Sequence, residues 1–411
     1  MGSSRSQRRR RTVLSAAFAG GLGGLSGCLQ PLLEAGEEDE SDQADGDSDE
    51  QTADEEQTVH VDDVSLTESA TIDTAGSLRW VTAVDDEFYF QEEAPPDGEG
   101  WVNRVDIDGT VDWESERVSR DEYELLVDGP IDTDGSLVYV GADSYHTDQD
   151  GGRLYAFDFE SGQSEWHYDA AETGHEDVVW ELTASDDGVV YGVGSHGSGS
   201  DQQPRVGALD ASGTELWDHQ FDEGFVTGLA VYDGTVYTAA SNELIAYDLA
   251  SGDKLETYSV TPTFDALAYE GSELYVADDF GNALTRFDMN RGEQRWSTET
   301  VQDIESRPTV GIEVVCVGAE AGYVLAYDRE TGDTRWETRL EGSVATGPVA
   351  EDGLVWVTDE QQDLYALEER DGDIRHHRTL TPDYDEGELQ LAVTDGVLAT
   401  EAEPITYSIE R

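Results

Sequence analysis

The chain has 411 residues, of which 93 are Asp or Glu and 23 are Lys or Arg, so its formal net charge is −70. This charge excludes nucleic acid and anionic headgroup surfaces as partners, because both would repel it. It does not indicate disorder, since 9 Trp, 18 Tyr and 10 Phe recur at regular positions. A carboxylate-rich chain with a single lysine, Lys254, favours a haloarchaeal type of protein over an ordinary acidic one.

The N-terminal segment has the order of an export signal. Residues 1–11 contain five arginines, an apolar stretch follows from Val13 to Leu25, and Ser26-Gly27-Cys28 comes next. Arg10 and Arg11 resemble a twin-arginine motif, and Leu25 to Cys28 resembles a lipobox, in which the cysteine is acylated. A membrane-spanning helix is the alternative, but the stretch is short and rich in glycine. We therefore predict a lipoprotein signal peptide over residues 1–27, with lipidation of Cys28.

The next segment is strongly acidic. From Glu34 to Glu56, 13 of 23 residues are Asp or Glu and none is basic. Like charges at this density repel one another and keep a chain extended. We predict an acidic, disordered tether over residues 28–56, which holds the following domain off the membrane surface.

Residues 57–411 repeat one pattern at a period of about 40 residues, which indicates propeller blades. The clearest copy begins at Val324, has Asp328 before a turn glycine at Gly332, and reaches Trp336. The turn glycines are Gly109, Gly162, Gly213, Gly252, Gly292, Gly332 and Gly372. A tryptophan follows four residues later in five copies, namely Trp113, Trp166, Trp217, Trp296 and Trp336, whereas Glu256 and His376 take that place in the other two.

Each copy predicts four short strands, so the fold class is all-β. In the sixth copy we expect them near residues 308–310, 314–318, 323–328 and 334–340. Pairs such as Asp134-Gly135, Asp233-Gly234 and Asp352-Gly353 predict the turns between strands. The aspartates before the turn glycines are interpreted as structural acceptors for turn amides rather than as catalytic acids.

An eighth unit is incomplete and is predicted to draw on both ends of the domain. Residues 389–399 and 405–409 supply three strands after the seventh copy, and the period-two stretch 58–66 can supply the fourth. Pairing the N- and C-terminal strands would close an eight-bladed ring of four-stranded sheets and remove open edges. A seven-bladed ring with a loose C-terminal piece is the alternative.

The Asp-to-Gly-to-Trp pattern resembles the tryptophan-docking repeat of the pyrroloquinoline-quinone-like propeller family. That family includes quinoprotein dehydrogenases and the propeller lipoprotein of the bacterial outer-membrane assembly machine, and the lipoprotein branch is the one we expect here. The resemblance implies that each tryptophan packs on the turn of the neighbouring blade. In the dehydrogenases it would also imply a quinone over a tryptophan, a disulfide between adjacent cysteines and a calcium ion.

The residues for that chemistry are not evident in the sequence. Its two cysteines, Cys28 and Cys316, are not adjacent, and Cys316 is interpreted as a small buried hydrophobe. Residues 106–109 and 148–151 are similar to calcium-loop openings, but turns are favoured because no glutamate stands at position 12. His376-His377 lacks a third ligand at a recognisable spacing. We expect no metal and no cofactor, and in particular no pyrroloquinoline quinone.

The sequence thus favours an anchored scaffold that binds a protein partner at the outer face of the cytoplasmic membrane, as a monomer. A quinone- or sugar-binding oxidoreductase is the alternative, so an enzyme is not excluded. The partner is not identified, since a haloarchaeal cell has no outer membrane to assemble. Long segments in the first three blades, at residues 92–100, 144–152 and 195–203, predict the binding face, although such loops also simply tolerate insertion. The candidate residues are Arg120, Tyr123, Tyr145, His146, His175, His196 and Arg205.

Overall fold

The computed structural model describes residues 64–84, 86–94, 99–119, 130–142, 153–170, 177–185, 188–195, 204–221, 226–240, 243–258, 266–278, 282–380, 390–400 and 402–411. The predicted signal peptide, with Arg10, Arg11 and Cys28, and the predicted tether lie outside these residues. No helix in the described ranges is long and apolar enough to cross a membrane.

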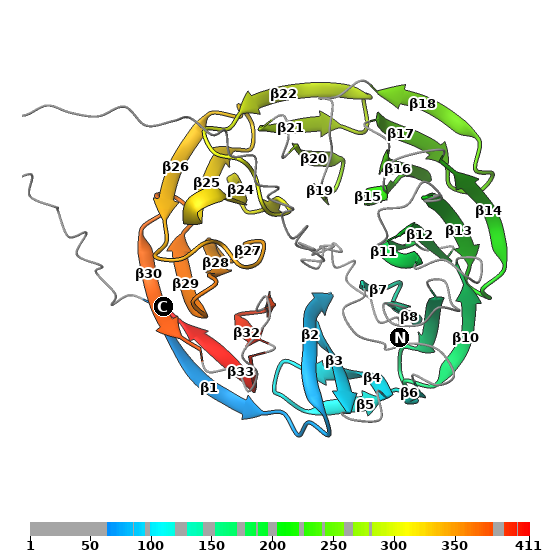
Figure 1. Cartoon of the computed structure of the whole chain (residues 1–411), viewed down its shortest axis with the longest axis horizontal. Coiled ribbons are helices and arrows are strands. Elements are labelled where there is room, and N and C mark those ends of the chain that lie inside the picture. The colour runs from blue at the N-terminus through cyan, green and yellow to red at the C-terminus, as the bar shows by residue number, and fades with distance from the viewer. Residues whose placement is uncertain are drawn as a thin grey trace, which may run out of the picture. The chain divides into compact units, whose positions relative to one another are not determined.

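Eight antiparallel sheets stand side by side around a common centre (Figure 1), which confirms the predicted eight-bladed propeller. Each blade is ordered from the centre outward. The first four blades are β2 (Ser77–Val84), β3 (Glu87–Ala94), β4 (Glu99–Asp106) and β5 (Val111–Glu114), with β6 (Val118–Ser119) also pairing β4; β7 (Ile131–Thr133), β8 (Leu137–Ala142), β9 (Arg153–Asp158) and β10 (Ser164–Asp169); β11 (Asp177–Ser185), β12 (Gly188–Ser195), β13 (Arg205–Asp210) and β14 (Glu215–Gln220); and β15 (Val226–Tyr232), β16 (Thr235–Ala240), β17 (Glu243–Asp248) and β18 (Lys254–Tyr258).

The last four blades follow the same order. They are β19 (Ala266–Glu270), β20 (Glu273–Asp278), β21 (Ala283–Asp288) and β22 (Glu293–Glu299); β23 (Thr309–Val310), β24 (Val314–Ala319), β25 (Tyr323–Asp328) and β26 (Thr334–Arg339); β27 (Val349–Glu351), β28 (Leu354–Thr358), β29 (Asp363–Glu368) and β30 (Ile374–Thr379); and β31 (Leu391–Thr394), β32 (Val397–Thr400), β33 (Glu403–Glu410) and β1 (Ser65–Thr71). A short 3₁₀ helix, η1 (Glu320–Gly322), connects β24 to β25.

The ring is closed by the first and last described strands. β1 forms the outer edge of blade 8 and pairs antiparallel with β33, from Ser65 opposite Glu410 to Thr71 opposite Ile405. The predicted pairing of the termini is therefore confirmed, and the seven-bladed alternative is wrong. The strand lies later in the chain than predicted, at 65–71 rather than 58–66. β1 is an exposed outer strand, so its alternation carries too little apolar signal to fix its place.

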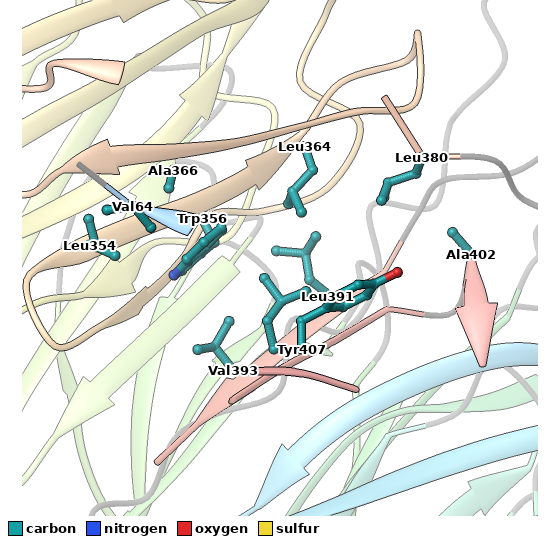
Figure 2. Close-up of a cluster of buried hydrophobic side chains, with 11 residues drawn as sticks. Val64, Leu354, Trp356, Leu364, Ala366, Leu380, Leu391, Val393, Ala402 and Tyr407 are labelled. Carbon is teal, nitrogen blue, oxygen red and sulfur yellow. The ribbon is translucent and has the colours of Figure 1, made fainter. Parts of the chain in front are cut away.

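The apolar core lies between blades. Eight clusters of buried side chains are present among the described residues, and each joins two neighbouring blades, including blades 8 and 1. Figure 2 shows the cluster between blades 7 and 8, where Trp356 and Leu364 face Leu391, Val393 and Tyr407. No blade therefore buries its apolar faces alone, and each depends on its two neighbours for burial.

The turns explain the recurring aspartates. The amides of Glu330 and Thr331 each donate to Asp328 Oδ1 at 2.9 Å, and Asp158, Asp210 and Asp248 accept turn amides in the same way. At Asp233-Gly234 and Asp352-Gly353 both residues have positive φ, as two-residue hairpin turns require. These acids therefore cap turns.

The predicted docking tryptophans lie between blades. Each indole Nε1–H donates to a backbone carbonyl in the turn of the next blade. The pairs are Trp113 to Phe159 at 2.9 Å, Trp166 to Ala211 at 3.0 Å, Trp217 to Leu249 at 2.7 Å, Trp296 to Arg329 at 2.9 Å and Trp336 to Glu369 at 2.7 Å. The indole ring also covers the turn glycine of the next blade. At Gly372, for example, an added Cβ would lie 2.6 Å from Trp336 Cδ2. Glycine at this turn is required by positive φ and by the close approach of the indole.

Three junctions use other residues. At the junction of blades 4 and 5, Tyr258 lies over Gly292, and Tyr237 donates to the carbonyl of Met289 at 3.0 Å. From blade 7, His376 Nδ1 lies 3.2 Å from the carbonyl oxygen of Val64. In blade 8 the docking position is occupied by Ala70, whose Cβ packs against the turn glycine Gly109 of blade 1. The first two of these variations are visible in the sequence, where Glu256 and His376 stand in the place of the tryptophan.

Two arginines reinforce the docking bonds in a way that the sequence does not predict. Arg104 lies opposite Trp113 and Arg286 lies opposite Trp296 on the third strand of their blades. Each donates from Nη1 to the carbonyl that also accepts the indole, at 2.6 Å and 2.7 Å respectively. These carbonyls therefore accept two donors from the preceding blade, one of them charged.

Candidate functional site

The predicted binding face lies where the second strand of a blade leads into the third. The second and fourth strands run in the same direction because both are antiparallel to the third. Their connections therefore leave from one face of the ring. In blades 2 and 3 the second-to-third connections span 143–152 and 196–204, whereas that of blade 7 spans only 359–362. The excess length lies on the face predicted from the sequence.

Arg205 is the one predicted binding residue in the described part of the chain. The other six, Arg120, Tyr123, Tyr145, His146, His175 and His196, lie outside it. Arg205 begins β13 and is half-buried, with its Nε 3.5 Å from Asp218 Oδ2 in β14. Its Nη1 donates to the carbonyl of Ala170 at 3.5 Å. The structure thus gives Arg205 a charged contact within blade 3 and a hydrogen bond to the end of blade 2.

Blade 1 corrects part of the loop prediction. Residues 92–94 and 99–100, expected in a loop extension, are strand residues at the ends of β3 and β4. Glu92 is 1% exposed, and its Oε2 accepts the amides of Ala75 at 3.0 Å and Gly76 at 2.8 Å. Burial raises the pKa of Glu92, which the amide bonds partly offset. This carboxylate anchors the connection from β1 to β2 and is not available to a partner.

The innermost strands place a second group of residues at one level of the ring. This level lies four residues before the last residue of the innermost strand that pairs with the second strand across their connecting turn. The residues, from blade 1 to blade 8, are Trp80, Pro130, Glu181, Gly228, Ala266, Arg307, Gly347 and Gln390. A charged pair therefore stands among mainly small or neutral residues.

Glu181 and Arg307 form an ion pair between blades that are not neighbours. Arg307 Nη1 donates to Glu181 Oε2 at 3.1 Å, and Nη2 contacts Oε1. Glu181 belongs to blade 3 and Arg307 precedes β23 of blade 6, so their contact crosses the centre of the ring. The side chains are 6% and 13% exposed. Burial lowers the pKa of Arg307 to about 10, so it remains charged at neutral pH.

Sequence reasoning missed this pair. The two residues are 126 positions apart, and neither belongs to the repeated motif. A signal nevertheless exists, because counting back from each first turn aligns Glu181 and Arg307 with glycine or alanine in three other blades. Only the ring geometry shows that these two positions meet.

A second polar contact lies next to the ion pair. Thr183 Oγ1 lies 3.2 Å from the hydroxyl of Tyr269 in blade 5, and Asp132 Oδ2 of blade 2 accepts the amide of Ala184 at 2.9 Å. Burial raises the pKa of Tyr269 to about 12, so its phenol stays protonated and can donate. Blades 2, 3 and 5 are therefore linked through inner-strand side chains.

The other candidate residues have structural surroundings. Asp108 caps its turn by accepting the amide of Thr110 at 2.9 Å. His377 stacks on Tyr365 with centroids 4.6 Å apart, while His376 faces Val64. Cys316 is fully buried, and burial raises the pKa of its thiol. Within the described ranges no three His, Cys, Asp or Glu residues are grouped to hold a metal ion.

The fold and its docking contacts define an eight-bladed β-propeller in which tryptophans dock most blades on their neighbours. A family model described as outer membrane protein assembly factor BamB matches residues 202–305 and 282–397. The two overlapping matches cover residues 202–397, so this part of the chain is similar to that family. No match was found among curated proteins.

Solved structures with the same fold include BamB and two dehydrogenases. BamB from Moraxella catarrhalis is similar over 84% of this chain and 98% of its own, with 19% identity and a TM-score of 0.60. A europium-containing methanol dehydrogenase is similar over 82% of this chain and 84% of its own, with 14% identity and a TM-score of 0.59. Quinohemoprotein alcohol dehydrogenase from Comamonas testosteroni covers 84% of this chain and is itself covered to 76%, with 14% identity and a TM-score of 0.59. At these identities the similarity shows the fold alone.

The residues present do not fit the quinone site that the enzymes of this fold imply. The sequence offers no adjacent cysteines, and Cys316 is enclosed in the core between blades 6 and 7. Glu181 is the carboxylate at the central level described above, and both of its oxygens contact Arg307. A carboxylate engaged in this way is not free to bind calcium. We therefore derive no chemistry through a quinone.

Proposed function

We propose that this protein is a membrane-anchored scaffold that binds a protein partner outside the cell. The observation that carries the proposal is the match of residues 202–397 to the family model described as outer membrane protein assembly factor BamB. A ring whose blades are locked together by indole-to-carbonyl bonds supplies a rigid support for binding loops. The particular partner of BamB is not transferred to this chain.

Anchoring is part of the proposal and rests on the N-terminal sequence. The arginines at positions 10 and 11 would direct export, and acylation of Cys28 would attach the mature chain to the outer face of the cytoplasmic membrane. The acidic segment 34–56 would then separate the propeller from the bilayer. A similar protein named as an outer-membrane assembly factor supports a location outside the cytoplasm.

Replacing Cys28 by Ser should move the protein from the membrane fraction to the soluble extracellular fraction. An acyl chain contributes about 0.8 kcal/mol per buried methylene, and the variant would lose all of it. Fractionation of cells followed by immunoblotting measures the change, with Cys316→Ser as the matched control. Retention of the Cys28→Ser protein in membranes would disprove the lipid anchor.

The partner is proposed to bind the face that carries the long connections of blades 2 and 3. Shortening the connections 143–152 and 196–204 to the four-residue length found in blade 7 should abolish capture of the native partner. Melting should be unchanged, because the strands that these loops connect stay paired. Affinity capture from native membranes after cross-linking tests this. A variant altered in the turn 311–313, on the opposite face, serves as control, and undiminished capture by the shortened variant would place the site elsewhere.

An oxidoreductase is the second candidate, and the similarity to a methanol dehydrogenase favours it. Titration calorimetry with pyrroloquinoline quinone and calcium separates the two proposals. We expect no binding, because adjacent cysteines are absent and Glu181 is paired with Arg307. Binding at one quinone per chain would favour the enzyme.

A further inference from the structure

The ion pair between Glu181 and Arg307 spans one of the three junctions that lack a docking tryptophan. Blades 3 and 6 flank blades 4 and 5, and the junction of these two lacks a tryptophan. Its docking position is held by Glu256, which is exposed, so the indole contact is missing. The hydrogen bond between Thr183 and Tyr269 also links blade 3 to blade 5 without passing through blade 4.

We propose that the Glu181–Arg307 pair is a brace across the ring axis that keeps blades 3 to 6 closed when falling salt increases the repulsion between surface carboxylates. The device is conformational and does not depend on the identity of the partner. Its two ends are fixed, since Glu181 lies within β11 and Arg307 lies beside Ser306, whose Oγ accepts the amide of Gly318 at 2.7 Å.

The residues around the pair permit this contact. At the same level, the two intervening blades carry Gly228 and Ala266, whose side chains are too short to reach the axis. Gly228 cannot be enlarged, because a Cβ there would lie 2.3 Å from Leu267 Cγ. The acid and the base can therefore meet over blades 4 and 5 without an intervening side chain from either.

Burial gives the brace a different salt dependence from the surface. Exposed charges are separated by solvent, so their repulsion grows as the Debye length rises from about 3 Å in 1 M salt to about 30 Å at 0.01 M. The paired groups are 6% and 13% exposed, and dissolved ions screen such a pair much less. The attraction thus persists over the salt range in which the surface of this chain, with a net charge of −70, becomes increasingly repulsive.

The test compares Glu181→Gln, Arg307→Met and the double variant with the unaltered full chain, each as a function of salt. We expect each single variant to raise the salt concentration at half-unfolding by about twofold or more, because a buried charge loses its partner. Removing both charges should cost less than the sum of the single changes. Arg335→Met is the matched control, since Arg335 lies on the outer strand β26 and forms an exposed ion pair with Asp328.

Hydrogen exchange locates the effect. In the single variants, protection should fall about tenfold or more in the strands of blades 4 and 5, from β15 to β22, and stay unchanged in blade 1. Single variants with the salt response of Arg335→Met would overturn the proposal. An equal loss of protection in all blades would also overturn it, because a brace acts on the segment that it spans. If a single variant does not fold, the double variant must fold at molar salt, and its failure to do so would count against the proposal.

Discussion

Single residues decide how firmly one blade holds the next, and Trp336 shows this most clearly. Its side chain is 7% exposed, its indole donates to the carbonyl of Glu369, and its ring covers Gly372. The hydrogen bond and the buried ring area are both lost when the side chain is truncated. Docking tryptophans are therefore the residues at which small changes should have large effects on the ring.

Replacing Trp336 by Ala should lower the free energy of unfolding by about 3–5 kcal/mol, the usual range for a buried aromatic. Chemical denaturation at one molar salt concentration measures the loss. Arg335→Ala is the control, because the adjacent side chain is 39% exposed and pairs only with Asp328. A loss below about 1 kcal/mol for Trp336→Ala would show that the docking contact contributes little.

The turn aspartates make a prediction about acid stability. Burial is the largest single influence on Asp328 and disfavours its charged form, but the hydrogen bonds from Arg335 and from the amides of Thr331 and Glu330 together outweigh it and lower its pKa. A lowered folded pKa contributes stability that is complete above the unfolded value of about 3.9 and is lost as pH falls through the folded value.

Asp328→Asn should therefore be less stable than the unaltered protein at pH 6, and the difference should shrink below about pH 4. Denaturation curves over this pH range at constant salt provide the measurement. Asp112→Asn, on the outer strand of blade 1, is a control outside the turns. A stability difference that is independent of pH would mean that the charge of Asp328 does not contribute.

At the scale of whole elements, the sequence predicted the blades well and their edges less well. The strands of the sixth repeat were expected at 308–310, 314–318, 323–328 and 334–340 and are found at 309–310, 314–319, 323–328 and 334–339. Buried strands can be recognised in the sequence as apolar runs bounded by Asp and Gly. β1 was misplaced because both 58–66 and 65–71 alternate, and only its partner β33 selects between them.

The candidate site was less predictable for a physical reason. The repeat specifies contacts between a blade and its neighbour, such as Trp336 on Gly372, because they recur in every copy. Glu181 and Arg307 occur once each and meet across the ring, so no periodic signal relates them. The same is true of Tyr237, which replaces an indole donor from a different strand.

Removal of β1 should open the ring at blade 8. A chain that begins after Thr71 leaves the hydrogen-bonding edge of β33 unpaired, and such an edge recruits other chains. We expect oligomers in size-exclusion chromatography, and a synthetic peptide covering residues 64–72 should restore the monomer. A control variant that lacks only the residues before Val61 should behave as the full-length protein. A monomeric, fully stable protein without β1 would contradict the closure.

At the scale of the whole molecule, charge is the dominant property. The full chain has a net charge of −70, and most of its carboxylates belong to the closed ring, which creates self-repulsion that salt must screen. The melting temperature should fall steeply as salt drops from molar to tens of millimolar. Calorimetry at several salt concentrations measures this. A neutral cosolvent at matched osmolality is the control, and a melting temperature that does not change with salt would argue against a halophilic protein.

The pairing of β1 with β33 also orders events in time. Ser65 leaves the ribosome more than three hundred residues before its partner Glu410 is made. Blades 1 to 7 can therefore form in sequence as each hairpin emerges, whereas the eighth must wait for the final residues. The entropy of closing so long a loop grows only logarithmically with its length, but the search for a distant partner is slow. Of the described strands, β1 is thus made first and paired last. The growing chain carries an open sheet edge until β33 has been made.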